Sequence, residues 1–322
     1  MSSESQKLRV GVIGVGSLGR HHVRIYSQMA GVELVGVADT NLARAEEIAS
    51  ANHTHAFDDF EKLFDRVDAV SLAVPTVDHA SIGTRLLEQG IDVLVEKPIA
   101  DSVEHADGLI EAARTHRRVL QVGHVERFNP AVTAARKILK GPKFFEVHRL
   151  SLFTPRSLDV DVVLDLMIHD LDIVLSFVEA EVADIRAVGL PILTPRVDIA
   201  NVRLEFTNGC VANLTASRVS TEKVRKLRFF QPNDYVSIDY TRQEMLVLNL
   251  GRSENGEAKI DGRRVAAPLE EPLKLELESF VQAVRNRSVP VVTGEEGRRA
   301  LKVASDIARK IKEHSSIALG TN

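Results

Sequence analysis

The chain has 322 residues, a length that favours two domains over one or three. Its 41 Lys and Arg residues nearly balance 45 Asp and Glu residues, for a formal net charge of −4, which argues against a general binder of nucleic acids or anionic membranes. The single cysteine, Cys210, excludes an intrachain disulfide and a cysteine-only zinc site. The first residues lack a secretory pattern and no apolar run could span a bilayer, so we expect a cytoplasmic protein without membrane or nucleic-acid partners.

Short apolar, β-rich runs alternate with helix-like segments in the first third of the chain. We predict strands at 8–13, 33–38, 69–74, 93–95 and 119–122, and helices at 20–29, 41–51, 78–89 and 102–115. Ser102 is a suitable N-cap for the last of these helices. The alternation of strand and helix predicts a parallel sheet covered by helices.

The pattern changes near Gly123. One helical stretch is predicted at 161–178, then strands at 185–189, 201–206, 211–216, 226–230, 235–240 and 245–249, and finally two helices at 271–287 and 295–313. Consecutive strands with short turns indicate a largely antiparallel sheet, and residues 249–264 are expected to form an exposed hairpin or loop. We therefore predict domains at 1–123 and 124–322, with the last helix able to pack back on the first domain.

A glycine-rich turn separates the first predicted strand from the first helix. It has the spacing G-x-G-x-x-G and comprises Gly14, Val15, Gly16, Ser17, Leu18 and Gly19. In such turns the first glycine makes the tight bend, the second lets a pyrophosphate approach the backbone, and the third lets helix and strand pack closely. The helix N-terminus adds unpaired N–H groups and a partial positive charge. The turn predicts a dinucleotide site; the alternative is a strand–helix turn without a ligand.

Asp39 ends the second predicted strand, 20 residues after Gly19 (39 − 19 = 20). A carboxylate at this place can accept hydrogen bonds from the ribose hydroxyls of the adenosine half, and it repels a 2′-phosphate. Thr40 and Asn41 supply no cation for that phosphate, so NAD is predicted in preference to NADP, although Arg44 could reach in from the next helix. The alternative role for Asp39 is that of a helix N-cap.

Two further groups of polar residues indicate chemistry. Glu96 and Lys97 follow a buried strand, at the sheet edge where ligands bind in such folds. Asp165 and His169 are four residues apart and would share a helix face, where the carboxylate would raise the pKa of the imidazole. The alternative is an acidic stripe on a surface helix. A zinc site would need a third protein ligand that this pattern does not supply, so we predict no metal.

Four features together make the sequence resemble the Gfo/Idh/MocA family of nicotinamide-dependent sugar oxidoreductases. They are the glycine turn at 14–19, Pro75-Thr76 with His79, the Glu-Lys-Pro element at 96–98, and the segment 165–169. The resemblance implies an α/β protein with an N-terminal Rossmann domain and a C-terminal α/β domain. The second domain would carry an open, largely antiparallel sheet, whose exposed face commonly forms the contacts of a homodimer or homotetramer.

The resemblance also implies roles for individual residues. The catalytic site would be lined by Lys97, Asp165 and His169. NAD would be bound by the glycine turn and Asp39 together with Pro75, Thr76, His79, Glu96 and Lys97. We expect His169 to accept the hydroxyl proton, with Lys97 hydrogen-bonded to the same oxygen and Asp165 orienting the imidazole. The alternative is that Lys97 is the base.

Two longer segments, 123–130 and 160–170, look like the UDP-N-acetylglucosamine 3-dehydrogenase branch of that family. That branch makes a 3-keto sugar nucleotide, which an aminotransferase converts toward a 3-amino sugar for lipid A. We expect the sugar or sugar-nucleotide substrate to contact Arg127, Asn129 and Arg156, with Arg218 as a further candidate, because guanidinium groups match phosphate oxygens well. Two other functions stay open: a free-sugar or myo-inositol 2-dehydrogenase, and a non-catalytic NAD-binding sensor built on the same fold.

Overall fold

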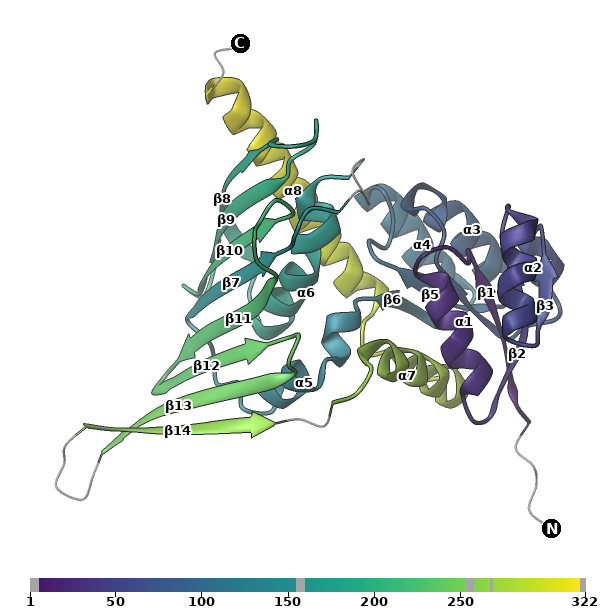
Figure 1. Cartoon of the computed structure of the whole chain (residues 1–322), viewed down its shortest axis with the longest axis horizontal. Coiled ribbons are helices and arrows are strands. Elements are labelled where there is room, and N and C mark those ends of the chain that lie inside the picture. Colours follow the sequence, from purple (N-terminus) through teal and green to yellow (C-terminus); the bar gives the residue numbers. More distant parts are fainter. Residues whose placement is uncertain (1–5, 155–159, 253–257, 267–268, 319–322) are drawn as a thin grey trace. The chain divides into compact units, whose positions relative to one another are not determined.

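The computed structural model describes residues 6–154, 160–252, 258–266 and 269–318. The chain forms two compact units (Figure 1). The first contains the described residues of Met1–Val125 and Glu271–Arg298, and the second those of Glu126–Glu270 and Arg299–Asn322. Residues 271–298 thus belong to the first unit, whereas the sequence-based division places everything after residue 123 in one second domain.

A six-stranded sheet forms the centre of the first unit. Its strands are β1 (Leu8–Ile13), β2 (Val32–Ala38), β3 (His55–Phe57), β4 (Ala69–Leu72), β5 (Asp92–Glu96) and β6 (Leu120–Gly123). Their spatial order is β3-β2-β1-β4-β5-β6, and every neighbouring pair is parallel, which confirms the predicted parallel sheet. This is the strand order of a Rossmann sheet, in which ligands bind beyond the carboxyl ends of the strands where the order reverses, here between β1 and β4.

Helices pack on this sheet because each has an apolar face to bury. They are α1 (Gly19–Gln28), α2 (Leu42–Ala51), α3 (Thr76–Glu88), α4 (Val103–Thr115) and α7 (Pro272–Asn286), with a 3-10 turn η1 (Phe60–Leu63). Helices α1, α2 and α7 share one apolar core with β1 and β2, and α3 packs against α4. Ser102 caps α4 as predicted, since its hydroxyl accepts from the N–H of His105 at 3.1 Å.

An eight-stranded sheet forms the second unit, in the order β14-β13-β12-β11-β7-β10-β9-β8. The strands are β7 (Phe144–Leu150), β8 (Val182–Leu190), β9 (Ile199–Phe206), β10 (Val211–Ser217), β11 (Val224–Gln231), β12 (Asp234–Asp239), β13 (Glu244–Arg252) and β14 (Ala258–Ala266). Only the pair of β7 and β10 is parallel among these neighbours in the described part of the chain, so the largely antiparallel sheet is confirmed.

Strand β7 lies in the middle of this sheet, between β11 and β10, and no strand is predicted there from the sequence. Its inward positions are Phe145, Val147 and Arg149, all of which are buried. Because one of these buried positions is an arginine, the apolar alternation that signals a strand is incomplete.

Helices α5 (Pro130–Arg136), α6 (Ile168–Phe177) and α8 (Gly294–Ala318) carry the second unit's helical layer (Figure 1). The apolar core between them and the sheet includes Phe145, Phe177 and Phe229. A 3-10 turn, η2 (Val125–Phe128), precedes α5, and a π-type turn, η3 (Val163–Met167), leads directly into α6. The predicted helix at 161–178 is therefore a wide turn followed by a regular helix. No helix in the described ranges is both long enough and apolar enough to cross a membrane.

Candidate functional site

The glycine turn joins the end of β1 to the start of α1. Gly14 has a φ of +82°, which a residue without a Cβ adopts at low cost, and its N–H donates to the carbonyl of Ala38 at 2.8 Å. A Cβ at Gly19 would lie 1.8 Å from the carbonyl oxygen of Gly14, so close packing requires glycine there. A Cβ at Gly16 would meet no atom within 4 Å in the part of the chain that the structure describes. The space in front of Gly16 is therefore open to a ligand.

The start of α1 is arranged to receive an anion. No side chain of the described residues caps the helix at Leu18, and its first turn holds no acidic residue. Val15 is buried, whereas Ser17 and Leu18 are exposed. Helix N-terminal N–H groups and the helix dipole stabilise negative charge. Together with the open side of Gly16, this fits the diphosphate of a dinucleotide.

Asp39 stands next to the turn, at the end of β2. Its Oδ2 accepts from the N–H of Val15 at 2.9 Å, and its Oδ1 accepts from the N–H of Asn41 at 2.9 Å and from Nη2 of Arg44 at 2.8 Å. Burial acts to raise the pKa of Asp39, but these hydrogen bonds and the Arg44 charge outweigh it and lower the pKa below its usual value. The N-cap of α2 is Asn41, so Asp39 is not the cap.

Pro75, Thr76 and His79 belong to the start of α3. Pro75 is the N-cap residue and Thr76 the first helical residue. His79 is buried, with Nδ1 2.9 Å from the carbonyl oxygen of Pro98 and Nε2 3.0 Å from that of Val74. Both ring nitrogens of His79 thus face main-chain carbonyls inside the protein, and its cofactor contact stays a prediction.

The Glu-Lys-Pro element follows β5. Glu96 is buried, with Oε1 3.0 Å from Nε2 of His22 and Oε2 accepting from the N–H of Lys97 at 3.2 Å. Lys97 is half-buried, and its peptide bond to Pro98 is cis. Both carboxylate oxygens of Glu96 are thus engaged within the protein, and its cofactor contact stays a prediction. From the sequence alone His22 is expected to face the helix exterior or the cofactor loop. The structure instead buries it, four residues before the buried Tyr26 on the inward face of α1.

In the second unit, Asp165 lies in the π-type turn η3 and His169 in the first turn of α6. Both are half-buried, and the residues Val163, Met167, Val174 and Phe177 of the same helical stretch are buried in the core. π-type turns recur at functional sites. Within the described ranges, no group of three or more His, Cys, Asp or Glu side chains could hold a metal ion.

The predicted substrate residues have contacts of their own. Arg127 is buried, and its Nε and Nη2 donate to Asp172 at 2.6 and 3.0 Å. Asn129 is the N-cap of α5, accepting from the N–H of Ala131 at 3.1 Å. Arg156 lies outside the described residues. A substrate role for these residues stays a prediction, and for Arg127 the ion pair already uses two of its N–H groups.

Arg218, the further candidate, is also buried. Its Nη2 donates to the carbonyl oxygen of Val160, and its Nε lies 3.8 Å from Oδ1 of Asp198. The alternative of an ordinary surface arginine does not hold, because Arg218 is buried, and a diphosphate contact of Arg218 stays a prediction.

Arg149 is the centre of a buried charge network that is not predicted from the sequence. Arg149 donates from Nε to Asp170 Oδ2 at 2.6 Å and from Nη2 to Glu126 Oε1 at 3.2 Å, and its guanidinium lies over the ring of Tyr240. Burial raises the pKa of Asp170, and the Arg149 charge only partly offsets that effect. Since Asp170 directly follows His169, this network anchors the first turn of α6.

Known proteins share this sequence and fold. An oxidoreductase family model with an NAD-binding Rossmann fold matches residues 8–124, and the GFO/IDH/MocA C-terminal domain matches residues 144–231. UDP-N-acetylglucosamine 3-dehydrogenase from Acidithiobacillus ferrooxidans is 38% identical over 93% of this chain and 96% of that protein. A solved structure of that enzyme has a TM-score of 0.90 at 36% identity, covering 95% of this chain and 98% of that one.

A second relative has another named activity. The scyllo-inositol 2-dehydrogenase (NAD(+)) of Bacillus subtilis is 27% identical over 89% of this chain and 89% of that protein. Both relatives align with nearly all of the chain, across the Rossmann sheet as well as the antiparallel sheet. The chain therefore belongs to the Gfo/Idh/MocA family of oxidoreductases, and its first unit is that family's NAD-binding Rossmann domain.

Proposed function

We propose that the protein oxidises a sugar hydroxyl with NAD, and that its substrate is UDP-N-acetylglucosamine, oxidised at C3 to the 3-keto sugar nucleotide. The observation that carries this proposal is the 38% identity, over 93% of the chain, to the A. ferrooxidans enzyme of that name. The product would be a ketone of the kind that an aminotransferase converts to a 3-amino sugar for lipid A.

The glycine turn, Asp39 and the start of α1 would hold the dinucleotide. The open side of Gly16 would admit the diphosphate, and the uncapped N-terminus of α1 would face it. The ionised carboxylate of Asp39 would accept from the ribose hydroxyls. When bound, NAD⁺ supplies the acceptor for the hydride. The remaining task of the chain is to orient the sugar and to move the hydroxyl proton.

In this proposal His169 accepts the hydroxyl proton and Lys97 hydrogen-bonds the same oxygen. An ammonium group only donates, so Lys97 would stabilise the negative charge that develops on the oxygen as its proton leaves. Asp165, one turn earlier in the same helical stretch, would orient the imidazole of His169. The alternative is that Lys97 is the base, since a lysine of lowered pKa can also remove a proton.

Turnover with UDP-N-acetylglucosamine tests the substrate. Purified protein with NAD⁺ should produce NADH and a product lighter by the mass of two hydrogens, whereas UDP-glucose, which lacks the acetamido group, should react poorly. Myo-inositol is the necessary comparison, because an inositol dehydrogenase is among the relatives. If the protein oxidised myo-inositol but not UDP-N-acetylglucosamine, myo-inositol would replace UDP-N-acetylglucosamine as the proposed substrate. NAD binding without turnover of any polyol or sugar nucleotide would favour the alternative that the protein is a non-catalytic NAD-binding sensor.

The proton-handling residues can be tested separately from the substrate. Lys97→Met and His169→Asn should each lower kcat by about 10²–10⁴-fold, the usual contribution of an acid–base group. NAD affinity should change little in His169→Asn and fall by about tenfold at most in Lys97→Met, since Lys97 is also a predicted cofactor contact. Lys302→Met, which breaks an exposed ion pair with Asp306 on α8, is a control that should leave turnover unchanged. Wild-type kcat in both site variants would reject these roles.

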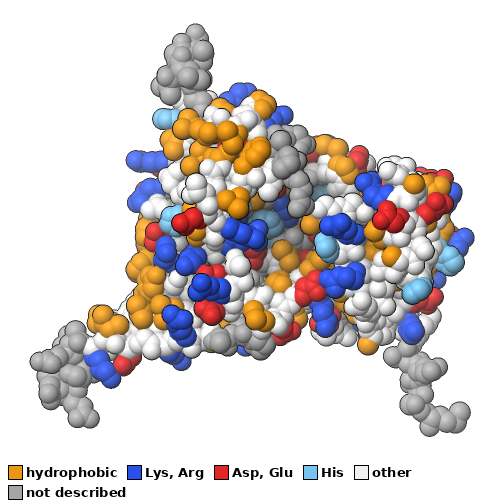
Figure 2. Space-filling model, in the orientation of Figure 1, with side chains coloured by type: hydrophobic (Ala, Val, Ile, Leu, Met, Phe, Trp, Pro, Cys, Tyr) orange, Lys and Arg blue, Asp and Glu red, His pale blue; other side chains and the backbone are white. Residues whose placement is uncertain are grey.

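We also propose a homodimer or homotetramer formed through the face of the second unit's sheet that is opposite its helical layer. Phe230 of β11 and Arg203 of β9 are exposed there, and Figure 2 shows hydrophobic, basic and acidic side chains intermixed on the visible surface. Phe230→Glu should lower the molar mass measured by light scattering; a wild-type monomer would contradict the proposal. We further propose a cytoplasmic location without nucleic-acid or membrane partners; the near-balanced charge supports the absence of nucleic-acid and anionic-membrane partners.

A further inference from the structure

The carboxylate of Glu96 is held from two sides inside the first unit. Its Oε1 lies 3.0 Å from Nε2 of His22 on α1, and its Oε2 accepts from the backbone N–H of Lys97 at 3.2 Å. The side chain of His22 has no exposed surface, and that of Glu96 is 11% exposed. The contact joins helix α1 to strand β5 through two residues that are 74 positions apart in the sequence.

The chemistry of this pair defines which atom donates. Burial acts to raise the pKa of Glu96, but the hydrogen bond and charge of His22, with the charge of Lys97, outweigh it and lower the pKa. An ionised carboxylate can only accept, so Nε2 of His22 carries the proton that it shares with Oε1. Nδ1 of His22 is buried and has no hydrogen-bond partner among the described residues. The contact with Glu96 is thus the hydrogen bond that orients this ring.

Gly123 of β6 leaves room for the side chain of Glu96, and His79 of α3 lies against Pro98, the residue after Lys97. Gly123 of β6 pairs in register with Glu96, and a Cβ at Gly123 would come within 3.1 Å of both Oε2 and Cα of Glu96. On the far side of Lys97, the carbonyl oxygen of Pro98 lies 2.9 Å from Nδ1 of the buried His79. A buried histidine therefore lies against the residue on each side of Lys97.

We propose that His22 and Glu96 are positioning residues for Lys97, which fix its backbone relative to the helix that follows the glycine turn. This inference rests on the proposed role of Lys97 in the reaction. An apolar pair of the same size would pack at lower desolvation cost than a buried carboxylate, so burial alone does not account for the pair. Geometry does: α1 begins at the dinucleotide turn, and its His22 reaches directly to the residue that precedes Lys97.

Three histidine variants test the inference. His22→Leu removes the donor, His22→Gln keeps a side-chain N–H that can reach the carboxylate, and His105→Leu removes an exposed histidine–carboxylate pair, that of His105 with Asp101, as a matched control. We expect His22→Leu to lower kcat by about 100-fold, the effect of misplacing a catalytic group by an ångström. His22→Gln should recover most of the loss, and His105→Leu should match the wild type.

The distinguishing readout is the separation of kcat from cofactor binding. The Kd for NADH, measured by fluorescence titration, should stay within about threefold of the wild type in all three variants, because the glycine turn is untouched. An equal fall of NADH affinity and kcat in both His22→Leu and His22→Gln would show a merely structural role for α1 and overturn the inference. So would wild-type kcat in His22→Leu.

Two further measurements keep the inference falsifiable if His22→Leu fails to fold. Gly123→Ala adds a methyl group that would crowd Glu96 from β6, so it should lower kcat with little change in NADH affinity. Wild-type kcat in that variant would contradict the inference. In protein with ¹⁵N-labelled histidine rings, the His22 Nε2–H should give a slowly exchanging downfield proton signal that the Gln variant lacks, and its absence from the wild type would contradict the hydrogen bond.

These outcomes are separable from failure of the proposed function. All kcat comparisons use whichever sugar or polyol the wild type oxidises, so a substrate other than UDP-N-acetylglucosamine rejects the substrate proposal alone. Loss of activity in Lys97→Met combined with full activity in His22→Leu rejects only the positioning. Full activity in Lys97→Met rejects the role of Lys97, and the positioning with it.

Discussion

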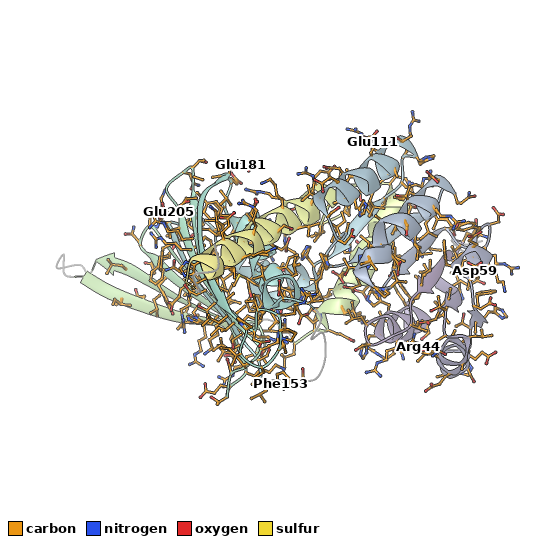
Figure 3. All side chains as sticks on the ribbon, turned by 90° about the horizontal axis from the view of Figure 1, so that it is seen from above. Arg44, Asp59, Glu111, Phe153, Glu181 and Glu205 are labelled. Atoms are coloured by element: carbon orange, nitrogen blue, oxygen red, sulfur yellow. The ribbon has the colours of Figure 1, made fainter. Side chains whose placement is uncertain are left out.

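Arg44 forms an ion pair with Asp39 at the carboxyl end of β2, with Nη2 2.8 Å from Oδ1. The Asp39 side chain is 5% exposed and that of Arg44 is 45% exposed, so the carboxylate is fixed while the guanidinium lies at the surface of the first unit, where Figure 3 labels it. The residue that is predicted to favour NAD is thus paired with a cation that a 2′-phosphate could also bind.

This pairing predicts how cofactor preference will change. Asp39→Ala should weaken NADH binding roughly tenfold to 100-fold through loss of a charged hydrogen-bond acceptor, and should strengthen NADPH binding because it releases Arg44. The double variant Asp39→Ala/Arg44→Ala should lose NADH affinity without gaining NADPH affinity. Fluorescence titration with both cofactors measures these effects. A single variant that still selects NADH as strongly as the wild type would refute the argument.

The two glycines of the turn should respond differently to alanine. Gly16→Ala adds a methyl group to open space, so thermal stability should be retained while NADH affinity falls about tenfold or more, since the methyl group stands where the diphosphate approaches. Gly19→Ala would place Cβ 1.8 Å from the Gly14 carbonyl oxygen and should destabilise the first unit itself. Thermal unfolding and NADH titration of both variants check the contrast; equal stability of the two would contradict it.

Removal of Arg149 should strongly destabilise the second unit. Arg149→Met leaves Asp170 and Glu126 buried without their cation, and breaking a buried ion pair in this way costs about 3–5 kcal/mol. The exposed pair of Lys302 and Asp306 on α8 is the matched comparison, where Lys302→Met should cost about 0.5 kcal/mol or less. Urea unfolding of the full chain measures both. Similar costs for the two substitutions would show that the Arg149 network does not stabilise the fold.

The hydrogen bonds to Asp198 predict that the turn before β9 loses stability in acid. Burial acts to raise its pKa, but hydrogen bonds from the Thr194 hydroxyl and from the backbone N–H groups of Thr194, Ile192 and Leu193 lower the pKa to about 2. Because the pKa is lower in the folded than in the unfolded chain, this carboxylate stabilises the fold above its ordinary pKa of 3.8. The stabilisation is lost as the pH falls from there to about 2.

The matching variant is Asp198→Asn, which should lower the free energy of unfolding at neutral pH by about 1–3 kcal/mol, because an amide leaves some of these donors without a good acceptor. The difference between wild type and variant should shrink as the pH falls below 3.8. Thermal unfolding at a series of pH values checks this. A difference that stays constant down to the lowest pH would assign the effect to packing instead of charge.

Local sequence patterns were enough to predict the glycine turn and the first unit's sheet except for its short edge strand β3. Strand and helix periodicities show within a few residues, and the spacing from Gly14 to Asp39 lies within one β–α–β crossover, so each feature is visible without knowing the rest of the fold. The identity of the residues also sufficed at the turn, because only glycine tolerates the Gly14 backbone and the Gly19 contact.

Contacts between distant segments could not be predicted in this way. Nothing near His22 indicates that its partner is Glu96, and nothing near Phe144–Leu150 indicates a strand inserted between β11 and β10 with an arginine facing inward. A buried charge is stable only where folding brings its counter-ion or donor to it, and the partner can come from anywhere in the chain. Packing therefore placed Glu96 against His22 and His79 against the carbonyl oxygen of Pro98, and gave Arg127 an ion pair with Asp172.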